Sequence, residues 1–93
     1  MKPDANQSEI VKALRAAGAS VHILAGVGCG CPDILIGWHN HNLLLEIKNP
    51  AGRGNRLTEA ETIWITSWQG QVAIVNSIDE ALAVLYGSFD VPE

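Results

Sequence analysis

The stretch GCPDILIGWHNHNLLLEIKNP, residues 30–50, decides the fold of this 93-residue chain. It contains two apolar runs, Ile34 to Trp38 and Leu43 to Ile47, with the polar residues HNHN between them. Asn and His suit a tight reversal, so the pattern predicts a β-hairpin. Both runs are almost continuously apolar, which is typical of strands covered on both faces. We therefore expect helices to cover the sheet.

A helix and a strand are predicted before this hairpin. Apolar residues recur at helical spacing from Asn6 or Ser8 to Gly18, and Asn6 with Glu9 three residues later resembles a capping box. Val21 to Leu24 is typical of a short first strand. The glycine-rich run AGVGCGCP, residues 25–32, then excludes a helix or a long strand and delivers the chain to Asp33 in a turn.

Two helices and a strand are predicted after the hairpin. The second helix opens at Leu57-Thr58, where Thr58 and Glu61 have capping-box spacing, and closes at Gly70. Val72 to Val75 forms a strand, and the last helix runs from Ser77 to Gly87. The order α-β-β-β-α-β-α joins antiparallel and parallel strands. We predict one α/β domain over residues 1–93, with a mixed central sheet flanked by helices.

Charge and hydropathy exclude several classes of protein. Six Lys and Arg residues against ten Asp and Glu residues give a net charge of −4, which argues against holding nucleic acid by bulk electrostatics alone. Acids that hold metal ions are partly neutralised, however, so nucleic acid stays open as a partner. No apolar run approaches the ~20 residues of a membrane helix, and no signal peptide is evident, so we expect a cytoplasmic protein without a membrane partner. The glycines fit neither phosphate-loop pattern, so no nucleotide cofactor is implied.

Asp33, Glu46 and Lys48 do not fit an ordinary core, because they lie in or beside apolar strands. If the turn is centred between Asn40 and His41, Lys48 lies opposite Asp33 and Glu46 lies opposite Leu35. Facing residues, and residues two apart in one strand, point to the same side of a sheet. Two carboxylates and an amine therefore converge on one face.

This convergence predicts a divalent cation, because an uncompensated charge in a covered sheet loses hydration worth several kcal/mol. Two carboxylates, a main-chain carbonyl and water form the oxygen shell that suits Mg²⁺ or Mn²⁺. Glu9 on the first helix supplies a third acid if that helix packs over the hairpin. Lys48 stays protonated and orients water or balances phosphate charge. The bland alternative is chance, since a short P-D and E-x-K pattern also arises on solvent-facing strands.

Three segments carry a family resemblance: GCPDILIGW, LLLEIKNP and LTEAETIWITSWQGQVAIVNSIDEAL. From about Ser8 to Leu85 the chain resembles the VRR-NUC (virus-type replication-repair nuclease) family of the PD-(D/E)XK nuclease superfamily. The resemblance implies a restriction-endonuclease-like core. It also implies a metal site made by Glu9, Asp33, Glu46 and the main-chain carbonyl of Ile47, with Lys48 as the motif lysine.

Glu61 departs from the family pattern, which usually has Gln at this position, four residues after the helix-opening Leu. A Glu at this position also completes the capping box with Thr58, so helix cap and site contact are both open interpretations. An added acid would repel phosphate, which bears on activity and metal preference.

The loop 49–56 carries Arg53 and Arg56 and no acid. Phosphate contact beside the metal site is the interpretation that we favour, and a solvated connection is the alternative.

Other reactive or aromatic residues have structural explanations. Cys29 and Cys31 lack the usual C-x₂₋₄-C zinc spacing, so we expect reduced thiols rather than a zinc site or a disulfide. The His residues at 39 and 41 fit the hairpin turn, although contact with DNA or a partner chain is an alternative. Trp64 and Trp68, four residues apart, fit core anchors better than a base-stacking platform.

We therefore expect a Mg²⁺- or Mn²⁺-dependent endodeoxyribonuclease that hydrolyses phosphodiester bonds. A chain of 93 residues offers little surface for gripping a duplex, so we expect a homodimer. The resemblance implies branched DNA, such as four-way (Holliday) junctions, as substrate, and a phage origin would fit. The alternative is a non-catalytic DNA-binding or interaction module that kept the nuclease fold.

Overall fold

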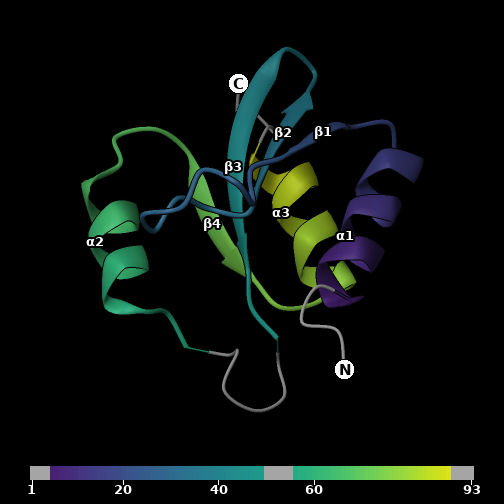
Figure 1. Cartoon of the computed structure of the whole chain (residues 1–93). Coiled ribbons are helices and arrows are strands. Elements are labelled where there is room, and N and C mark those ends of the chain that lie inside the picture. The colour runs from purple at the N-terminus through teal and green to yellow at the C-terminus, as the bar shows by residue number, and fades with distance from the viewer. Residues whose placement is uncertain (1–4, 50–55, 89–93) are drawn as a thin grey trace.

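The computed structural model describes residues 5–49 and 56–88. Its elements follow the predicted order (Figure 1): α1 (Ala5–Ala16), β1 (Ser20–Ile23), β2 (Ile34–Trp38), β3 (His41–Ile47), α2 (Glu59–Ser67), β4 (Val72–Val75) and α3 (Ile78–Ser88). The predicted α/β class is thus confirmed. Among the helices of these residues, none has the length and apolar character needed to cross a membrane.

The hairpin closes through a two-residue turn, because His39 and Asn40 have φ angles of 50° and 67°. Positive φ at both central residues is the requirement of a type I′ turn, and Asn and His accept this conformation better than most residues. Strand β3 therefore begins at His41, two residues earlier than predicted.

The predicted register of the hairpin is wrong by two residues. Ile34 pairs with Leu45, not with Ile47, because the turn is shorter and lies one residue earlier than we assumed. The N–H of Asp33 donates to the Leu45 carbonyl at 3.1 Å, so Asp33 lies across from the Leu45–Glu46 part of β3 and not from Lys48. A shift of two residues leaves every side chain on its predicted face, whereas a shift of one would have reversed them all.

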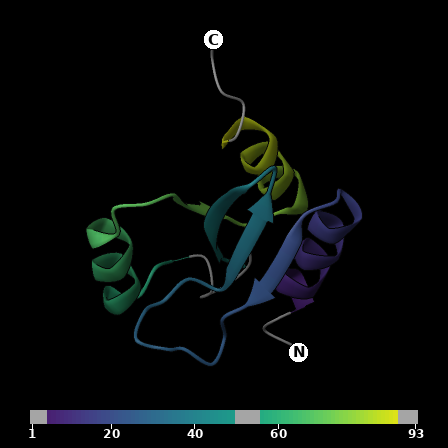
Figure 2. The same ribbon diagram turned by 90° about the horizontal axis from the view of Figure 1, so that it is seen from above.

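The sheet has four strands in the order β1-β2-β3-β4. The β2–β3 pair is antiparallel and the β3–β4 pair is parallel, as predicted, and β1 pairs antiparallel with β2. Helices α1 and α3 pack on one face of it (Figure 2). The core forms between these helices and that face, from the buried residues Ile10, Val11, Leu14, Ala19, Ile34, Ile36, Leu43, Leu45, Val75, Ala81 and Leu85.

Helix α2 lies on the other side of the sheet and buries none of its residues. Trp64 and Trp68 stack on each other with ring centroids 4.7 Å apart, and Trp68 is 45% exposed. The predicted sheet flanked by helices is confirmed, whereas the prediction that Trp68 is a core anchor is wrong. A single nine-residue helix held away from the strands leaves much of this face open.

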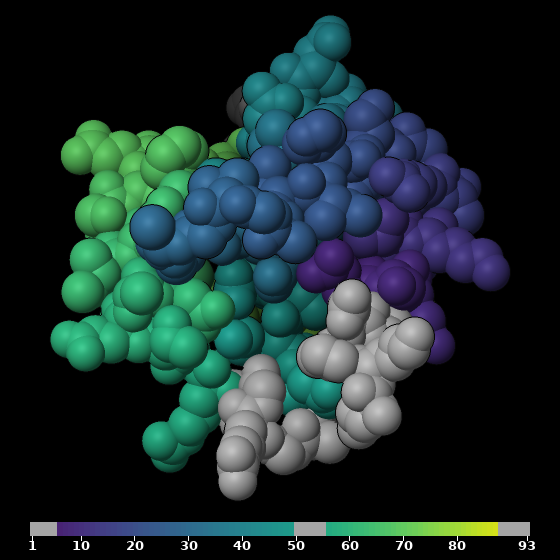
Figure 3. Space-filling view, in the orientation of Figure 1, coloured from purple at the N-terminus to yellow at the C-terminus, as the bar shows by residue number. Residues whose placement is uncertain are grey.

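The glycine-rich loop holds α2 beside the sheet. Gly30 has a φ of 85°, and a Cβ atom at this position would collide with the main-chain carbonyl of Ala60 in the first turn of α2. In Figure 3 the loop, in blue, reaches across the front of the molecule to α2, in green. Because a side chain would break this close approach, Gly30 sets the distance between loop and helix.

The side chain of Asn6 joins three elements, although its predicted capping role is wrong. The described helix is already formed at Ala5, so Asn6 lies inside α1. Its Nδ2 group donates to the carbonyls of Lys48 at 3.0 Å and Asn76 at 3.3 Å. Asn6 thereby satisfies main-chain acceptors where β3 and β4 end.

Candidate functional site

The ends of β2 and β3 bring Asp33, Glu46 and Lys48 together. Asp33 directly precedes β2, Glu46 lies in β3 and Lys48 follows β3. The Asp33 Oδ2 atom accepts a hydrogen bond from the main-chain N–H of Ile47 at 2.7 Å, which joins the carboxylate to the neighbouring strand. Burial raises the pKa of Asp33, while the Ile47 N–H and the charge of Lys48 partly oppose that increase.

Glu46 is the buried acid of the site, with 1% of its surface exposed. Within the described residues, its Oε1 atom is buried without a hydrogen-bond partner, while Oε2 lies 3.3 Å from the Lys48 Nζ. Burial raises the pKa of Glu46 to about 8, and the negative charges of Asp33 and Glu61 add to the effect. The contact with Lys48 offsets little of this cost, so the carboxyl group is mostly protonated at pH 7 when no cation is bound.

The Lys48 ammonium has three acceptors around it. Its Nζ atom lies 3.0 Å from Glu61 Oε1, 3.2 Å from the Arg56 carbonyl and 3.3 Å from Glu46 Oε2. Burial disfavours the charged amine, but the hydrogen bond and charge of Glu61, with a smaller contribution from Glu46, raise its pKa overall. Lys48 therefore acts as a fixed positive charge and hydrogen-bond donor.

Glu61 is both a helix-capping residue and a contact of the candidate site, the two interpretations that the sequence left open. Its N–H donates to Thr58 Oγ1 at 3.1 Å and its Oε1 accepts from the Thr58 N–H at 2.9 Å, which is a complete capping box. The same Oε1 atom accepts from Lys48. Burial opposes ionisation of Glu61, but the Thr58 N–H and Lys48 outweigh it and lower the pKa of the carboxyl.

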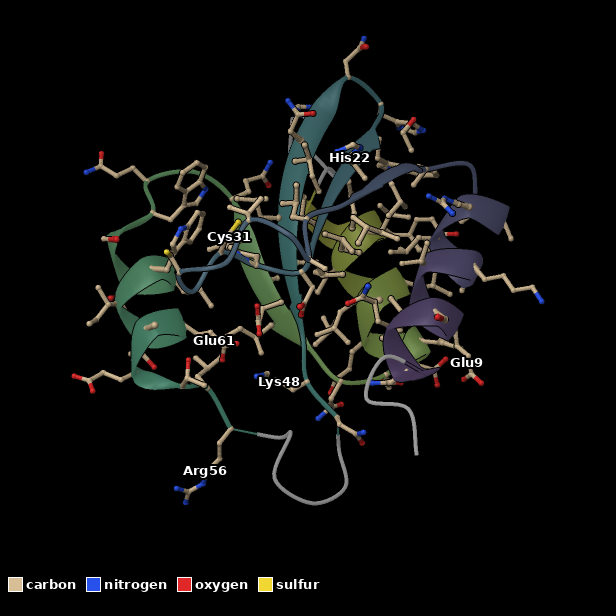
Figure 4. All side chains as sticks on the ribbon, in the orientation of Figure 1. Glu9, His22, Cys31, Lys48, Arg56 and Glu61 are labelled. Carbon is tan, nitrogen blue, oxygen red and sulfur yellow. The ribbon has the colours of Figure 1, made fainter. Side chains whose placement is uncertain are left out.

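Glu9 is not brought to this cluster. It is exposed on α1, which packs against the opposite face of the sheet, and Figure 4 shows it far to the right of Lys48 and Glu61. Arg56 lies beside the site, but its side chain is exposed and its main-chain carbonyl makes the contact with Lys48. Arg53 lies outside the described residues.

The donor set fits a hard divalent cation. Asp33 and Glu46 supply carboxylate oxygens, and Glu46 Oε1 needs a partner. The N–H and the carbonyl of one residue point the same way in an extended strand, so the Ile47 carbonyl faces the side on which its N–H meets Asp33. Among residues 5–49 and 56–88, no cluster of three or more His, Cys, Asp or Glu side chains is arranged to hold a metal ion. A cation would thus take two carboxylates, main-chain oxygen and water.

Cys31 is a neighbour of the site that sequence reasoning missed. Burial raises the pKa of its thiol, and the negative charges of Glu46 and Asp33 raise it further. Its position two residues before Asp33 was the available signal, since residues two apart on an extended chain share a face.

Comparison of the chain with protein-family models, curated proteins and solved structures found no match. The resemblance to VRR-NUC nucleases therefore depends on the residues themselves.

Proposed function

We propose that this chain is a Mg²⁺- or Mn²⁺-dependent nuclease of the PD-(D/E)XK type that hydrolyses phosphodiester bonds in DNA. The observation that carries the proposal is the buried Oε1 atom of Glu46, which has no hydrogen-bond partner within residues 5–49 and 56–88, beside a second carboxylate and a protonated lysine. A buried carboxylate with one oxygen atom left without a hydrogen bond is costly, and a divalent cation would offset that cost.

The residues that would hold the cation are Asp33, Glu46 and Ile47, the last through its main-chain carbonyl. When bound, such a cation polarises a phosphate and lowers the pKa of water. Asp33 is already oriented for this role by the hydrogen bond from the Ile47 N–H. Glu46 is held rigidly because it lies inside a strand that is paired on both sides.

Lys48 acts as a hydrogen-bond donor rather than as a base, because its raised pKa keeps it protonated. Its ammonium stabilises negative charge that develops on the phosphate oxygens and orients the attacking water. An amine with a lowered pKa would instead favour proton abstraction.

The proposed substrate is branched DNA, such as a four-way junction, and the proposed active form is a homodimer. Both come from the VRR-NUC resemblance. Arg56 lies next to the Lys48 contact with an exposed side chain, where it would meet a phosphate. Arg53, three residues earlier in the sequence, is proposed as a second phosphate contact and lies outside the described residues. These local charges matter because the net charge of −4 gives no general attraction for DNA.

The test is cleavage of labelled linear duplex, flap and four-way junction DNA with Mg²⁺, Mn²⁺ or EDTA. We expect cleavage that requires a divalent cation and that is lost in Asp33→Asn and Lys48→Ala. Circular dichroism and DNA binding of these variants provide the folding control. A chain that cuts none of these substrates with either cation is not this nuclease.

A DNA-binding or interaction module without catalysis is the second candidate function. It is favoured by the Lys48 ammonium, whose three protons all have protein acceptors, and by the extra acid Glu61. DNA binding that persists without cleavage, and that is unchanged in Lys48→Ala, would support this module.

A further inference from the structure

Glu46 has two competing uses in the proposed site. Its Oε2 atom lies 3.3 Å from the Lys48 ammonium, and its buried Oε1 atom has no hydrogen-bond partner in the part of the chain that the structure describes. A cation on this carboxylate would draw its charge away from Lys48 and place two positive groups close together. Like charges at such distances repel strongly where water is scarce. The Lys48 ammonium would then move away from the site unless a second carboxylate bound it.

Glu61 is the acid in position to hold Lys48. Its Oε1 atom lies 3.0 Å from Nζ, closer than Glu46, and its side chain is 21% exposed compared with 2% for Glu46. It belongs to α2 and not to the hairpin, so a cation bound at the strand ends leaves its main-chain position unchanged. Its Oε1 atom accepts hydrogen bonds from both the Lys48 ammonium and the Thr58 N–H.

The position of the Glu61 carboxylate is fixed independently of Lys48. The main-chain N–H of Thr58 donates to Glu61 Oε1 at 2.9 Å and so holds the carboxylate, while the Glu61 N–H donates to Thr58 Oγ1 at 3.1 Å and fixes the main chain of the same turn. The close approach of Gly30 to the main chain at Ala60 fixes the same helical turn from the other side. Because the Glu61 carboxylate is already ordered by these contacts, it loses little conformational entropy when it binds the Lys48 ammonium.

We propose that Glu61 is a positioning residue that holds the Lys48 ammonium when Glu46 turns to a divalent cation. This inference rests on the proposed function. Glu61 itself stays off the cation, which agrees with the lack of a three-residue metal cluster in the part of the chain that the structure describes. The helix-capping Glu thereby has a second role, which a neutral Gln would perform with hydrogen bonding alone.

The first test measures Mn²⁺ binding to the full chain, without DNA, by calorimetry. The variants are Glu61→Ala, Lys48→Met and the double variant. Without Glu61, Lys48 stays on Glu46 and competes with the cation, so we expect Glu61→Ala to weaken Mn²⁺ binding about tenfold. Lys48→Met removes the competitor, and in that background the same substitution changes binding about twofold or less.

Three results would overturn the inference or its basis. An equal loss in both backgrounds would make Glu61 a direct ligand, and no loss in either would make it a helix cap alone. Either result, with cleavage of DNA by the unmodified chain retained, removes this inference and leaves the proposed function. If the unmodified chain binds no Mn²⁺ and cuts no DNA, the proposed function itself fails.

A second measurement separates positioning from helix stability. Thr58→Ala removes the Oγ1 acceptor of the cap but keeps the main-chain N–H that binds Glu61 Oε1, so it should lower the melting temperature as Glu61→Ala does, with kcat unchanged. Glu61→Ala should lower kcat about tenfold at saturating Mn²⁺, and Glu61→Gln should recover most of this loss because its amide oxygen still accepts from Lys48. An equal loss of kcat in Thr58→Ala and Glu61→Ala would contradict positioning.

Discussion

The two faces of the sheet use similar strand residues for different purposes. Towards α1 and α3, alternate residues of β2 and β3 such as Ile34, Ile36 and Leu45 are completely buried. Towards α2, the same strands carry Leu35, Leu44 and Glu46, and no residue of α2 itself is buried. One face provides stability and the other holds an acid that costs stability. Such a division is typical of a site carried on a rigid scaffold.

The largest expected effect concerns the acid on the open face. Glu46→Gln keeps the shape of the side chain but removes its charge, so we expect cleavage of DNA to fall by about 10³-fold. Stability should not fall with it, because a neutral amide replaces a buried carboxyl group whose Oε1 atom has no hydrogen-bond partner among the described residues.

The check is single-turnover cleavage of a four-way junction at saturating Mn²⁺, together with thermal unfolding of both proteins. Ile36→Val, a small change on the packed face, is the matched control and should keep full activity. A Glu46→Gln protein that cuts DNA at the normal rate would remove Glu46 from the site.

The second prediction compares leucines on opposite faces of β3. Leu45 is completely buried against the helices, so Leu45→Ala should lower the free energy of unfolding by about 3 kcal/mol. Leu44 is 8% exposed and borders the open groove near Trp68, where neighbours can move, so Leu44→Ala should cost about half as much. Urea unfolding of both variants measures the difference. Equal losses would mean that the α2 face is packed as firmly as the other.

The element order was predictable because most elements carry a local signal. Gly18 follows the end of α1, Thr58 and Glu61 cap α2, and the apolar runs mark the strands. The helix ends predicted at Gly70 and Gly87 are wrong, because α2 ends at Ser67 and α3 continues to Ser88. The shared face of Asp33 and Glu46 was also predictable, since it depends on the two-residue period of a strand and survives a register error of two.

The features that could not be predicted depend on how helices and strands far apart in the sequence pack against one another. Leu44 and Leu45 are identical in the sequence, and their neighbours do not show which face a helix covers. The position of Glu9 depends on how α1 docks, and Glu61 serves as the acid beside Lys48 instead. The contact of the Arg56 carbonyl with Lys48 could not be predicted, because a sequence pattern of side chains does not indicate which main-chain carbonyl will accept a hydrogen bond.

The third prediction is that the free energy of unfolding depends on pH because of Glu46, on the face of the sheet towards α2. The pKa of Glu46 is about 8 in the folded chain, above its ordinary value of 4.5, so the folded state holds a proton that the unfolded state releases. This contribution to stability is complete below about pH 4.5 and is lost as the pH rises through 8.

We therefore expect the free energy of unfolding, without metal, to fall by about 4 kcal/mol between pH 5 and pH 9 relative to Glu46→Gln. Thermal or urea unfolding of both proteins across this range measures it. Mn²⁺ should reduce the fall, because it favours the carboxylate. Parallel curves for the two proteins would show that Glu46 ionises normally.

The smallest expected effect belongs to the outer side of α2. Ile63 is 60% exposed and α2 buries no residue, so Ile63→Ser should change the free energy of unfolding of the monomer by less than about 0.5 kcal/mol. Ile10→Ser, on the packed helix α1, is the contrasting variant and should cost several kcal/mol. Unfolding should be measured over a wide range of protein concentration, because a homodimer that covers α2 would make the Ile63→Ser effect grow with concentration. An effect above 1 kcal/mol at the lowest concentration would mean that α2 packs within its own chain, and the contrast between the two faces would then be wrong.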